Sequence, residues 1–288
     1  MPDRLSVTAP ASSANLGPGF DCLAVALELR NEVVVSAFGG VGVDVRVEGE
    51  GAEGVATDPS NLFVRAFAAA GADPAGLSFH MTNRIPLARG LGSSAATIAA
   101  GVAAGQVWAG READPLPEAA ALEGHPDNVA AAVLGGVTVA WTAAAGARAL
   151  RLRSCPVDFV CVIAADELET SRARAALPDQ VDHADAVHTA GRAALLVAAL
   201  DAGRADAIAE ALDDRLHEPF RAPLVPLLAA VRGRLAGLPA YGATLSGAGP
   251  SVLVWCEPGS GDVVAAGLDG LGARAIPLAV ADRGVTVS

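Results

Sequence analysis

The sequence has few aromatic residues, few basic residues and no cysteine pattern typical of a metal site. Phe, Trp and Tyr make up 4% of the 288 residues, so a core must be built mainly from Ala, Val and Leu. Lys and Arg number 20 against 32 Asp and Glu, and the net charge of −12 makes nucleic acid an unexpected partner. The four cysteines form no Cys-x-x-Cys pair, so we expect reduced, buried thiols.

A membrane-spanning segment is also missing from the pattern. The uncharged stretch from Val129 to Ala147 is interrupted by Gly135 and Gly136 and consists largely of alanine, so it is too weakly hydrophobic to insert. The alternation of Leu5-Ser6-Val7-Thr8 is typical of a strand and not of a signal peptide. We therefore expect a cytoplasmic protein without membrane contact.

The order of hydrophobic patterns predicts an α+β fold in two domains, 1–150 and 151–288. Short β-type runs open the chain, and they are joined by a loop predicted to extend from Ala9 to Asp21. Longer helical patterns dominate the second half, at 184–202, 205–216 and 224–235. A change of composition near 148–156 marks the expected boundary.

The segment Pro86-Leu87-Ala88-Arg89-Gly90-Leu91-Gly92-Ser93-Ser94-Ala95-Ala96 joins a glycine turn to the start of a helix. Gly90 and Gly92 allow main-chain N–H groups to approach a ligand, and Ser93 or Ser94 is expected as the N-cap. The positive end of the following helix favours an anion such as phosphate. The segment has neither the Lys of a Walker loop nor the third glycine of a dinucleotide fingerprint, which indicates a different class of kinase.

Three motifs in order along the chain resemble those of the GHMP kinases, the family that includes galactokinase and mevalonate kinase. They are the loop ending in Asp21, the phosphate loop 86–96 and the glycine-rich segment 242–251. Three further features resemble the homoserine-phosphorylating branch of the family: Ser13 to Asp21, Glu123-Gly124-His125-Pro126-Asp127-Asn128, and Thr170 to Pro178. The resemblance implies an N-terminal domain of ribosomal-protein-S5-like topology, a ferredoxin-like C-terminal domain and a homodimer. It also implies ATP-dependent phosphorylation of the L-homoserine side-chain hydroxyl in threonine biosynthesis.

The charged residues fit a zwitterionic substrate. Such a substrate needs an acid for its ammonium, guanidinium groups for its carboxylate and neutral polar groups for its hydroxyl. The residues that the resemblance places at the substrate are Asn15, Asp21, His125, Asp127, Asn128, Thr170, Arg174, Arg221 and Gly247. Thr170 is expected to orient the hydroxyl, and Asp127 either accepts its proton or contributes less than about a hundredfold to the rate.

The nucleotide side is expected to hold ATP and Mg²⁺. Ser94 and Glu123 are the predicted metal ligands, with Glu118 as an alternative carboxylate. Besides the phosphate loop, Asn61 resembles a residue on the adenine side. Two alternatives to homoserine phosphorylation stay open, namely a GHMP kinase for another small alcohol such as mevalonate, and an inactive amino-acid sensor of the same fold.

Overall fold

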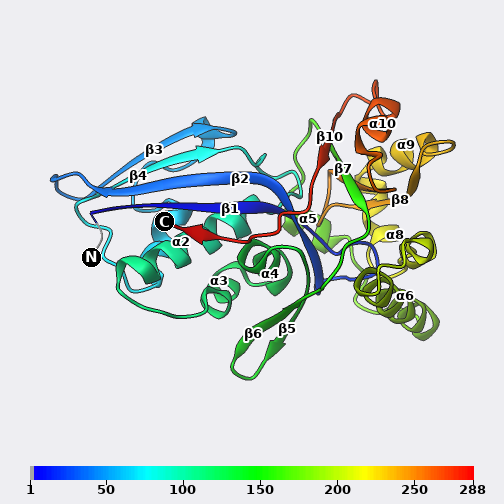
Figure 1. The fold of residues 1–288 in the computed structure, drawn as a ribbon, viewed down its shortest axis with the longest axis horizontal. Coiled ribbons are helices and arrows are strands. Elements are labelled where there is room, and N and C mark those ends of the chain that lie inside the picture. The colour runs from blue at the N-terminus through cyan, green and yellow to red at the C-terminus, as the bar shows by residue number, and fades with distance from the viewer. Residues whose placement is uncertain (1–2) are drawn as a thin grey trace.

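The computed structural model describes residues 3–288 and forms two parts, each built on its own sheet (Figure 1). The first sheet has seven strands in the order β11-β1-β2-β4-β3, with β5 paired to both β2 and β6. The second sheet has four antiparallel strands in the order β10-β7-β9-β8. Helices accompany both sheets, which confirms the predicted α+β class.

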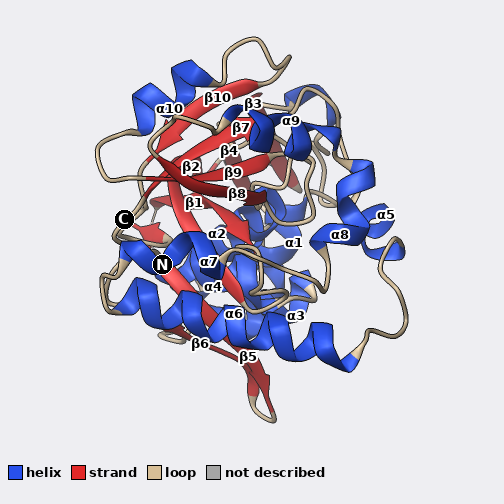
Figure 2. Cartoon of the chain, turned by 90° about the vertical axis from the view of Figure 1, so that its right-hand side faces the viewer, coloured by secondary structure: helices blue, strands red, loops and turns tan. Residues whose placement is uncertain are grey.

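The first part contains β1 (Arg4–Ala14), β2 (Leu23–Ala37), β3 (Val43–Gly49), η1 (Ala52–Gly54), α1 (Leu62–Ala69), β4 (Leu77–Asn83), α2 (Ser93–Trp108), α3 (Pro115–Glu123), α4 (Pro126–Leu134), β5 (Val137–Ala143) and β6 (Gly146–Arg151). The second contains β7 (Asp158–Ile163), α5 (Thr170–Ala175), α6 (His183–Asp201), η2 (Ala205–Ala207), α7 (Ile208–Ala211), α8 (Glu218–Arg221), η3 (Ala222–Leu224), α9 (Pro226–Arg234), β8 (Ala240–Leu245), β9 (Val252–Cys256), α10 (Gly261–Gly267) and β10 (Arg274–Leu278). Figure 2 looks onto this second part and shows α6 as a long helix apart from α9 and α10.

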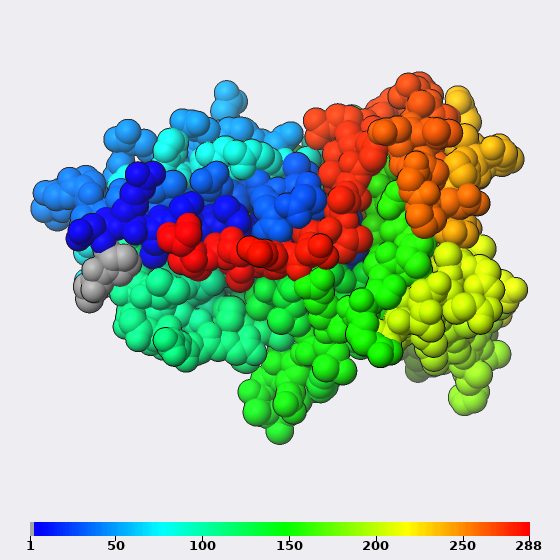
Figure 3. Space-filling model, in the orientation of Figure 1, coloured from blue at the N-terminus to red at the C-terminus, as the bar shows by residue number. Residues whose placement is uncertain are grey.

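The C-terminal segment returns to the first sheet. Strand β11 (Thr286–Val287) pairs antiparallel with β1, and the Ala281 N–H donates to the Ala26 carbonyl oxygen over 2.9 Å. In Figure 3 this red segment crosses the surface of the first part beside the blue N-terminal strand. The predicted range 151–288 therefore has its last residues on the first sheet.

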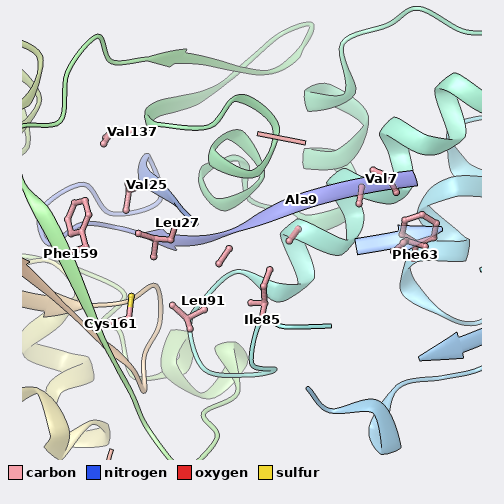
Figure 4. Packing of buried hydrophobic residues seen from close by; sticks show 14 of the residues in the cluster. Val7, Ala9, Val25, Leu27, Phe63, Ile85, Leu91, Val137, Phe159 and Cys161 are labelled. Carbon is pink, nitrogen blue, oxygen red and sulfur yellow. The ribbon is translucent and has the colours of Figure 1, made fainter. Parts of the chain in front are cut away.

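One hydrophobic cluster connects the two sheets. It includes Leu27 of β2 and Leu91 before α2 together with Phe159 and Cys161 of β7, all of them buried. Figure 4 shows these side chains between the strands of the two parts. A shared core of this kind opposes independent movement of the two parts. Separating them would expose apolar surface, which costs about 25 cal/mol of free energy per Å².

The loop between β1 and β2 is shorter than the sequence predicts. Strand β1 continues to Ala14, and only 15–22 connect it to β2. The pairing register shifts between Pro10 and Ala11, and such a bulge accommodates a residue that lacks an N–H donor. The prediction of a loop from Ala9 to Asp21 is therefore wrong in extent.

The expected helix 205–216 is also wrong. The chain forms η2 and α7 and then turns, because the Asp214 carboxylate accepts the N–H groups of Leu216, His217 and Glu218. An aspartate side chain that binds local N–H groups competes with helical hydrogen bonding. This turn positions α8 at the boundary of the candidate site.

Helix α2 packs closely on α1 through two glycines. A Cβ at Gly101 would lie 2.7 Å from the Phe63 carbonyl oxygen, and one at Gly105 would lie 2.3 Å from the Phe67 carbonyl oxygen. These close backbone contacts fix the position of α2, the helix that follows the phosphate loop, against α1. Among the helices of residues 3–288, none is both long enough and apolar enough to cross a bilayer.

We predict that Gly105→Ala lowers the free energy of unfolding by roughly 1–3 kcal/mol, because the added methyl group collides with the α1 backbone. The matched control is Gly191→Ala in α6, where a Cβ meets no atom within 4 Å. That change should raise stability by up to about 1 kcal/mol, since alanine has the higher helix propensity. Urea unfolding followed by circular dichroism measures both, and equal effects would contradict the packing argument.

Candidate active site

Three glycine-rich segments that are distant in the sequence meet at one point. The Ser246 hydroxyl oxygen lies 2.7 Å from the Gly90 carbonyl oxygen and 2.8 Å from Ser13 Oγ. The Gly247 N–H donates to the Ala14 carbonyl oxygen over 3.1 Å. A Cβ at Gly90 would lie 2.2 Å from the Ser246 carbonyl oxygen, and Gly90 has φ +73°, so this contact requires glycine.

Helix α2 begins without a capping side chain. Its N-cap is Gly92, in the left-handed conformation, and the expectation that Ser93 or Ser94 is the N-cap is wrong. The physical reason is the close approach of β1, since a Cβ at Gly92 would lie 2.0 Å from Ser12 Oγ. Gly92 therefore occupies the left-handed N-cap position, and the helix starts at Ser93. No side-chain cap bonds to the first-turn N–H groups, which leaves the positive helix end available to an anion.

A cavity in front of this helix end collects nearly all the predicted site residues. Its lining includes Asn15, Asp21, Pro86, Arg89, Gly90, Leu91, Gly92, Ser93, Ser94, Glu123, His125, Asp127, Asn128, Thr170, Arg174, Arg221 and Gly247. The exceptions are Ala95 and Ala96, whose side chains are buried in the core, and Asn61, which lines an adjoining cavity. Residues from both parts of the chain thus face one space.

Asp21 and Arg174 form a bidentate ion pair within the cavity. Arg174 Nη2 donates to Asp21 Oδ1 over 2.9 Å and Nη1 donates to Oδ2 over 3.1 Å. Both side chains are about one-third exposed. The acid and one guanidinium predicted for the substrate are therefore paired with each other in this structure.

Arg221 has a different environment. Arg221 is only 1% exposed. Within residues 3–288, no carboxylate lies within 4.0 Å of its guanidinium group. Its Nε donates to the Ala173 carbonyl oxygen over 3.3 Å, and Nη1 lies 3.2 Å from Nδ1 of His217. Burial and the neighbouring Arg174 lower the pKa of Arg221. A buried cation without a carboxylate partner strongly favours an anionic ligand.

Asn15 supports the backbone around the cavity. Its Nδ2 donates to the Gly247 carbonyl oxygen over 2.7 Å, and its Oδ1 accepts from the Asp21 N–H over 3.0 Å. Asn15 and Asp21 both have positive φ, at 69° and 55°. Such strained backbone is typical of functional sites that the surrounding structure holds in place.

Asp127 and Asn128 lie in the first turn of α4, which begins at Pro126. Burial raises the pKa of Asp127 to about 6, and the carboxylate accepts from the Asn128 N–H over 2.7 Å. Asn128 Oδ1 accepts from the Ser12 hydroxyl over 2.8 Å. A carboxyl with a pKa near neutrality is suited to take a proton from a substrate hydroxyl.

Ser94 and Glu123 are brought together at the helix end. The Ser94 hydroxyl donates to Glu123 Oε2 over 2.7 Å, and burial raises the pKa of Glu123. The alternative carboxylate, Glu118, accepts from Gln106 and pairs with Arg111. Gln106 is about 18 Å beyond Ser94 along the α2 axis, so the structure places Glu118 away from the helix end.

The adjoining cavity has a mostly apolar surface and shares Ala88, Ser93 and Ser94 with the first. Its lining also includes Val55, Asn61, Leu62, Met81, Asn83, Leu87 and Thr97. Asn61 is the N-cap of α1, its Oδ1 accepting from the Phe63 N–H over 2.9 Å and its Nδ2 donating to the Ala56 carbonyl oxygen over 2.7 Å. This side chain therefore fixes the wall of the cavity.

The Arg89 side chain connects the phosphate loop to the second part. Its guanidinium donates to the carbonyl oxygens of Ala164 and Ala165 and lies 3.1 Å from the Glu167 carboxylate. The loop is thus anchored to the segment that follows β7, while its main-chain N–H groups stay available to a ligand.

Sequence reasoning missed Phe20 and His217. Their rings stack with centroids 5.0 Å apart, and the guanidinium carbons of Arg221 and Arg174 lie 5.1 and 5.8 Å from the Phe20 centroid. Phe20 is next to the predicted Asp21, which was a local signal. His217 carried no such signal, because it reaches the site only through the Asp214 turn.

The chain matches the sequence profiles of both GHMP kinase domains, the N terminal domain at residues 61–136 and the C terminal domain at residues 196–272. It is 44% identical to a homoserine kinase of Streptomyces coelicolor, over 96% of this chain and 95% of the relative. It is 45% identical to a homoserine kinase of Gloeobacter violaceus, over 86% of each chain.

Solved structures agree with this relationship. The homoserine kinase of Cytophaga hutchinsonii superposes with a TM-score of 0.87 at 28% identity, covering 100% of this chain and 98% of that one. A mevalonate kinase of L. major shares only the fold, with a TM-score of 0.74 at 14% identity over 95% and 94% of the two chains. The motifs, the site geometry and these matches together show that the chain belongs to the homoserine kinase branch of the GHMP kinase family.

Proposed function

We propose that this chain transfers the γ-phosphoryl group of ATP to the side-chain hydroxyl of L-homoserine, forming O-phospho-L-homoserine in threonine biosynthesis. The observation that carries the proposal is the position of the Asp21 carboxylate and of the Arg174 and Arg221 guanidinium groups in one cavity with an uncapped helix N-terminus. A small zwitterion and a polyphosphate can then bind to one cavity from opposite sides.

The Asp21–Arg174 pair supports an amino-acid substrate. In this structure the two side chains neutralise each other. A zwitterion can replace both halves of this pair at once, its ammonium binding Asp21 and its carboxylate binding Arg174 and Arg221. A substrate with a carboxylate but no ammonium, such as mevalonate, would leave Asp21 without its partner, which costs free energy in a partly buried site.

The phosphoryl donor is held mainly by backbone N–H groups. The first turn of α2 and the glycine turn before it supply these donors, and the apolar cavity lined by Leu62 and Met81 suits the adenine ring. Mg²⁺ fits the paired oxygens of Ser94 and Glu123, since it prefers hydroxyl, carboxylate and phosphate ligands. When bound, the ion would neutralise charge on the phosphate oxygens.

Transfer requires the substrate hydroxyl to lie in line with the γ-phosphate. Thr170, the first residue of α5, and Asn128 line the cavity where the hydroxyl would lie, and Asp127 lines the same cavity as the carboxylate that would take its proton. Because phosphoryl transfer depends mostly on positioning and charge neutralisation, a strong base is not obligatory. We therefore assign Asp127 a supporting role.

Two further parts of the proposal rest on the family resemblance. The chain acts as a homodimer, which sedimentation velocity tests, and it is located in the cytoplasm, which cell fractionation tests.

The alternative of an inactive amino-acid sensor is disfavoured because the phosphate loop and the substrate acid are both present.

We predict that purified protein with ATP and Mg²⁺ releases ADP in step with phosphohomoserine when L-homoserine is supplied. With mevalonate or L-threonine, ADP release should be at least a hundredfold slower, since neither presents both an ammonium and a primary hydroxyl at the same reach. A coupled ADP assay with product identification by mass spectrometry measures this. Homoserine binding without ADP release would instead indicate the sensor.

We predict that Asp127→Asn lowers kcat by less than about a hundredfold with little change in the homoserine KM. In the parent protein kcat should rise with pH through about 6, because the Asp127 carboxyl is protonated below that pKa and ionised above it. The pH profile of the variant should lack this rise. Turnover abolished with homoserine binding intact would show that an obligatory base has been removed.

We predict that Glu123→Gln raises the Mg²⁺ concentration needed for half-maximal rate at least tenfold, because a neutral amide is a weaker ligand than a carboxylate. Glu118→Gln is the matched control, since Glu118 faces Arg111 and not the helix end. Its Mg²⁺ requirement should equal that of the parent protein. Equal shifts in both variants would argue against the assignment of Glu123.

A further inference from the structure

His217 is fully buried beside the cavity, yet its ring does not line it. Its Nε2 lies 2.8 Å from the Gly17 carbonyl oxygen, and its Nδ1 lies 3.2 Å from Nη1 of Arg221. A carbonyl oxygen only accepts and a guanidinium only donates. The ring is therefore neutral, with its proton on Nε2 and a lone pair on Nδ1 directed at Arg221.

The surroundings favour this neutral form. Burial is the main cause that lowers the pKa of His217, and Arg221 lowers it further. The carboxylates of Asp214, 3.6 Å from Nε2, and Glu218 act in the opposite direction. The Asp214 carboxylate is bound by three backbone N–H groups, including that of His217 itself. These bonds hold the backbone of His217 in place.

The ring also limits where Arg221 can point. It stacks on Phe20 at an interplanar angle of 20°, and the Arg221 guanidinium lies over the same Phe20 ring. The Ala173 carbonyl oxygen accepts from Nε of Arg221 on another side. Three neutral groups thus orient a buried cation, and none of them neutralises its charge.

We propose that His217 is a positioning residue for the substrate carboxylate, its Nδ1 holding the Arg221 guanidinium toward the cavity. A carboxylate in place of this imidazole would also orient Arg221, but it would compete with the substrate for the positive charge. A neutral acceptor fixes the geometry and leaves the charge for the ligand. The inference rests on the proposed function in that the anion is taken to be the carboxylate of homoserine.

Two substitutions of His217 distinguish the role of its Nδ1 acceptor from that of its Nε2 donor. His217→Asn can place an amide oxygen near the position of Nδ1, so it keeps the acceptor for Arg221 and loses the donor to Gly17. His217→Gln can place an amide nitrogen near Nε2, so it keeps the donor and loses the acceptor. Both variants lose the stacking on Phe20, which makes each the control for the other.

We expect His217→Gln to raise the homoserine KM about ten- to hundredfold, as for loss of a hydrogen bond to a charged group. His217→Asn should stay within about threefold of the parent protein, and the ATP KM should be unchanged in both. In an Arg221→Met background the two variants should have the same homoserine KM, because the residue through which His217 acts is gone. Two results would overturn the proposal. One is a difference in homoserine KM between the two variants that is as large in the Arg221→Met background as in the parent protein. The other is a larger rise in homoserine KM for His217→Asn than for His217→Gln.

A spectroscopic measurement separates this inference from the proposed function. Long-range ¹H–¹⁵N spectra of histidine-labelled protein, assigned by the signal missing in His217→Asn, report the tautomer without any substrate. We expect a neutral ring protonated on Nε2 between pH 6 and 8, and an imidazolium or the Nδ1–H tautomer would refute the contact with Arg221. Absence of homoserine turnover in the parent protein would refute the proposed function alone.

Discussion

The site depends on the close backbone contact between the phosphate loop and the C-terminal glycine segment. The Gly90 carbonyl oxygen accepts from Ser246, and no residue with a Cβ fits at Gly90 without moving the facing backbone. This contact, together with the Gly247–Ala14 hydrogen bond, fixes the phosphate loop before α2 relative to the end of β1 and to the glycine segment after β8. Backbone from both parts of the chain therefore forms one continuous wall of the cavity.

The positive side-chain charge in the cavity comes from arginine. All 20 Lys and Arg positions of the chain are arginines, so every permanent positive charge on its side chains is a guanidinium group. The structure uses both, the helix end for one anion and Arg221 with Arg174 for another. Guanidinium forks suit a planar carboxylate, whereas the rigid backbone donors suit the phosphates that must be aligned for transfer.

The two parts are held together by more than the site. The shared hydrophobic cluster, the Arg89 side chain and the return of residues 279–288 to the first sheet each connect them. Because Arg89 and Leu91 of the phosphate loop take part in two of these links, the loop cannot shift without breaking contacts to the second part. Preorganisation of this kind reduces the entropy that binding must remove before phosphoryl transfer.

The sequence alone determined the α+β class, the phosphate loop and nearly the full set of cavity residues. Glycine turns, helix starts and charged side chains are recognisable there because their physical reasons are local. It did not determine the N-cap at Gly92, the pairing of Asp21 with Arg174, the absence of a carboxylate within 4.0 Å of Arg221 among residues 3–288, or the contact of His217 with Arg221. Those features depend on which distant segments come into contact, and only the tertiary structure decides how closely Ser12 approaches Gly92 and where the Asp214 turn places α8.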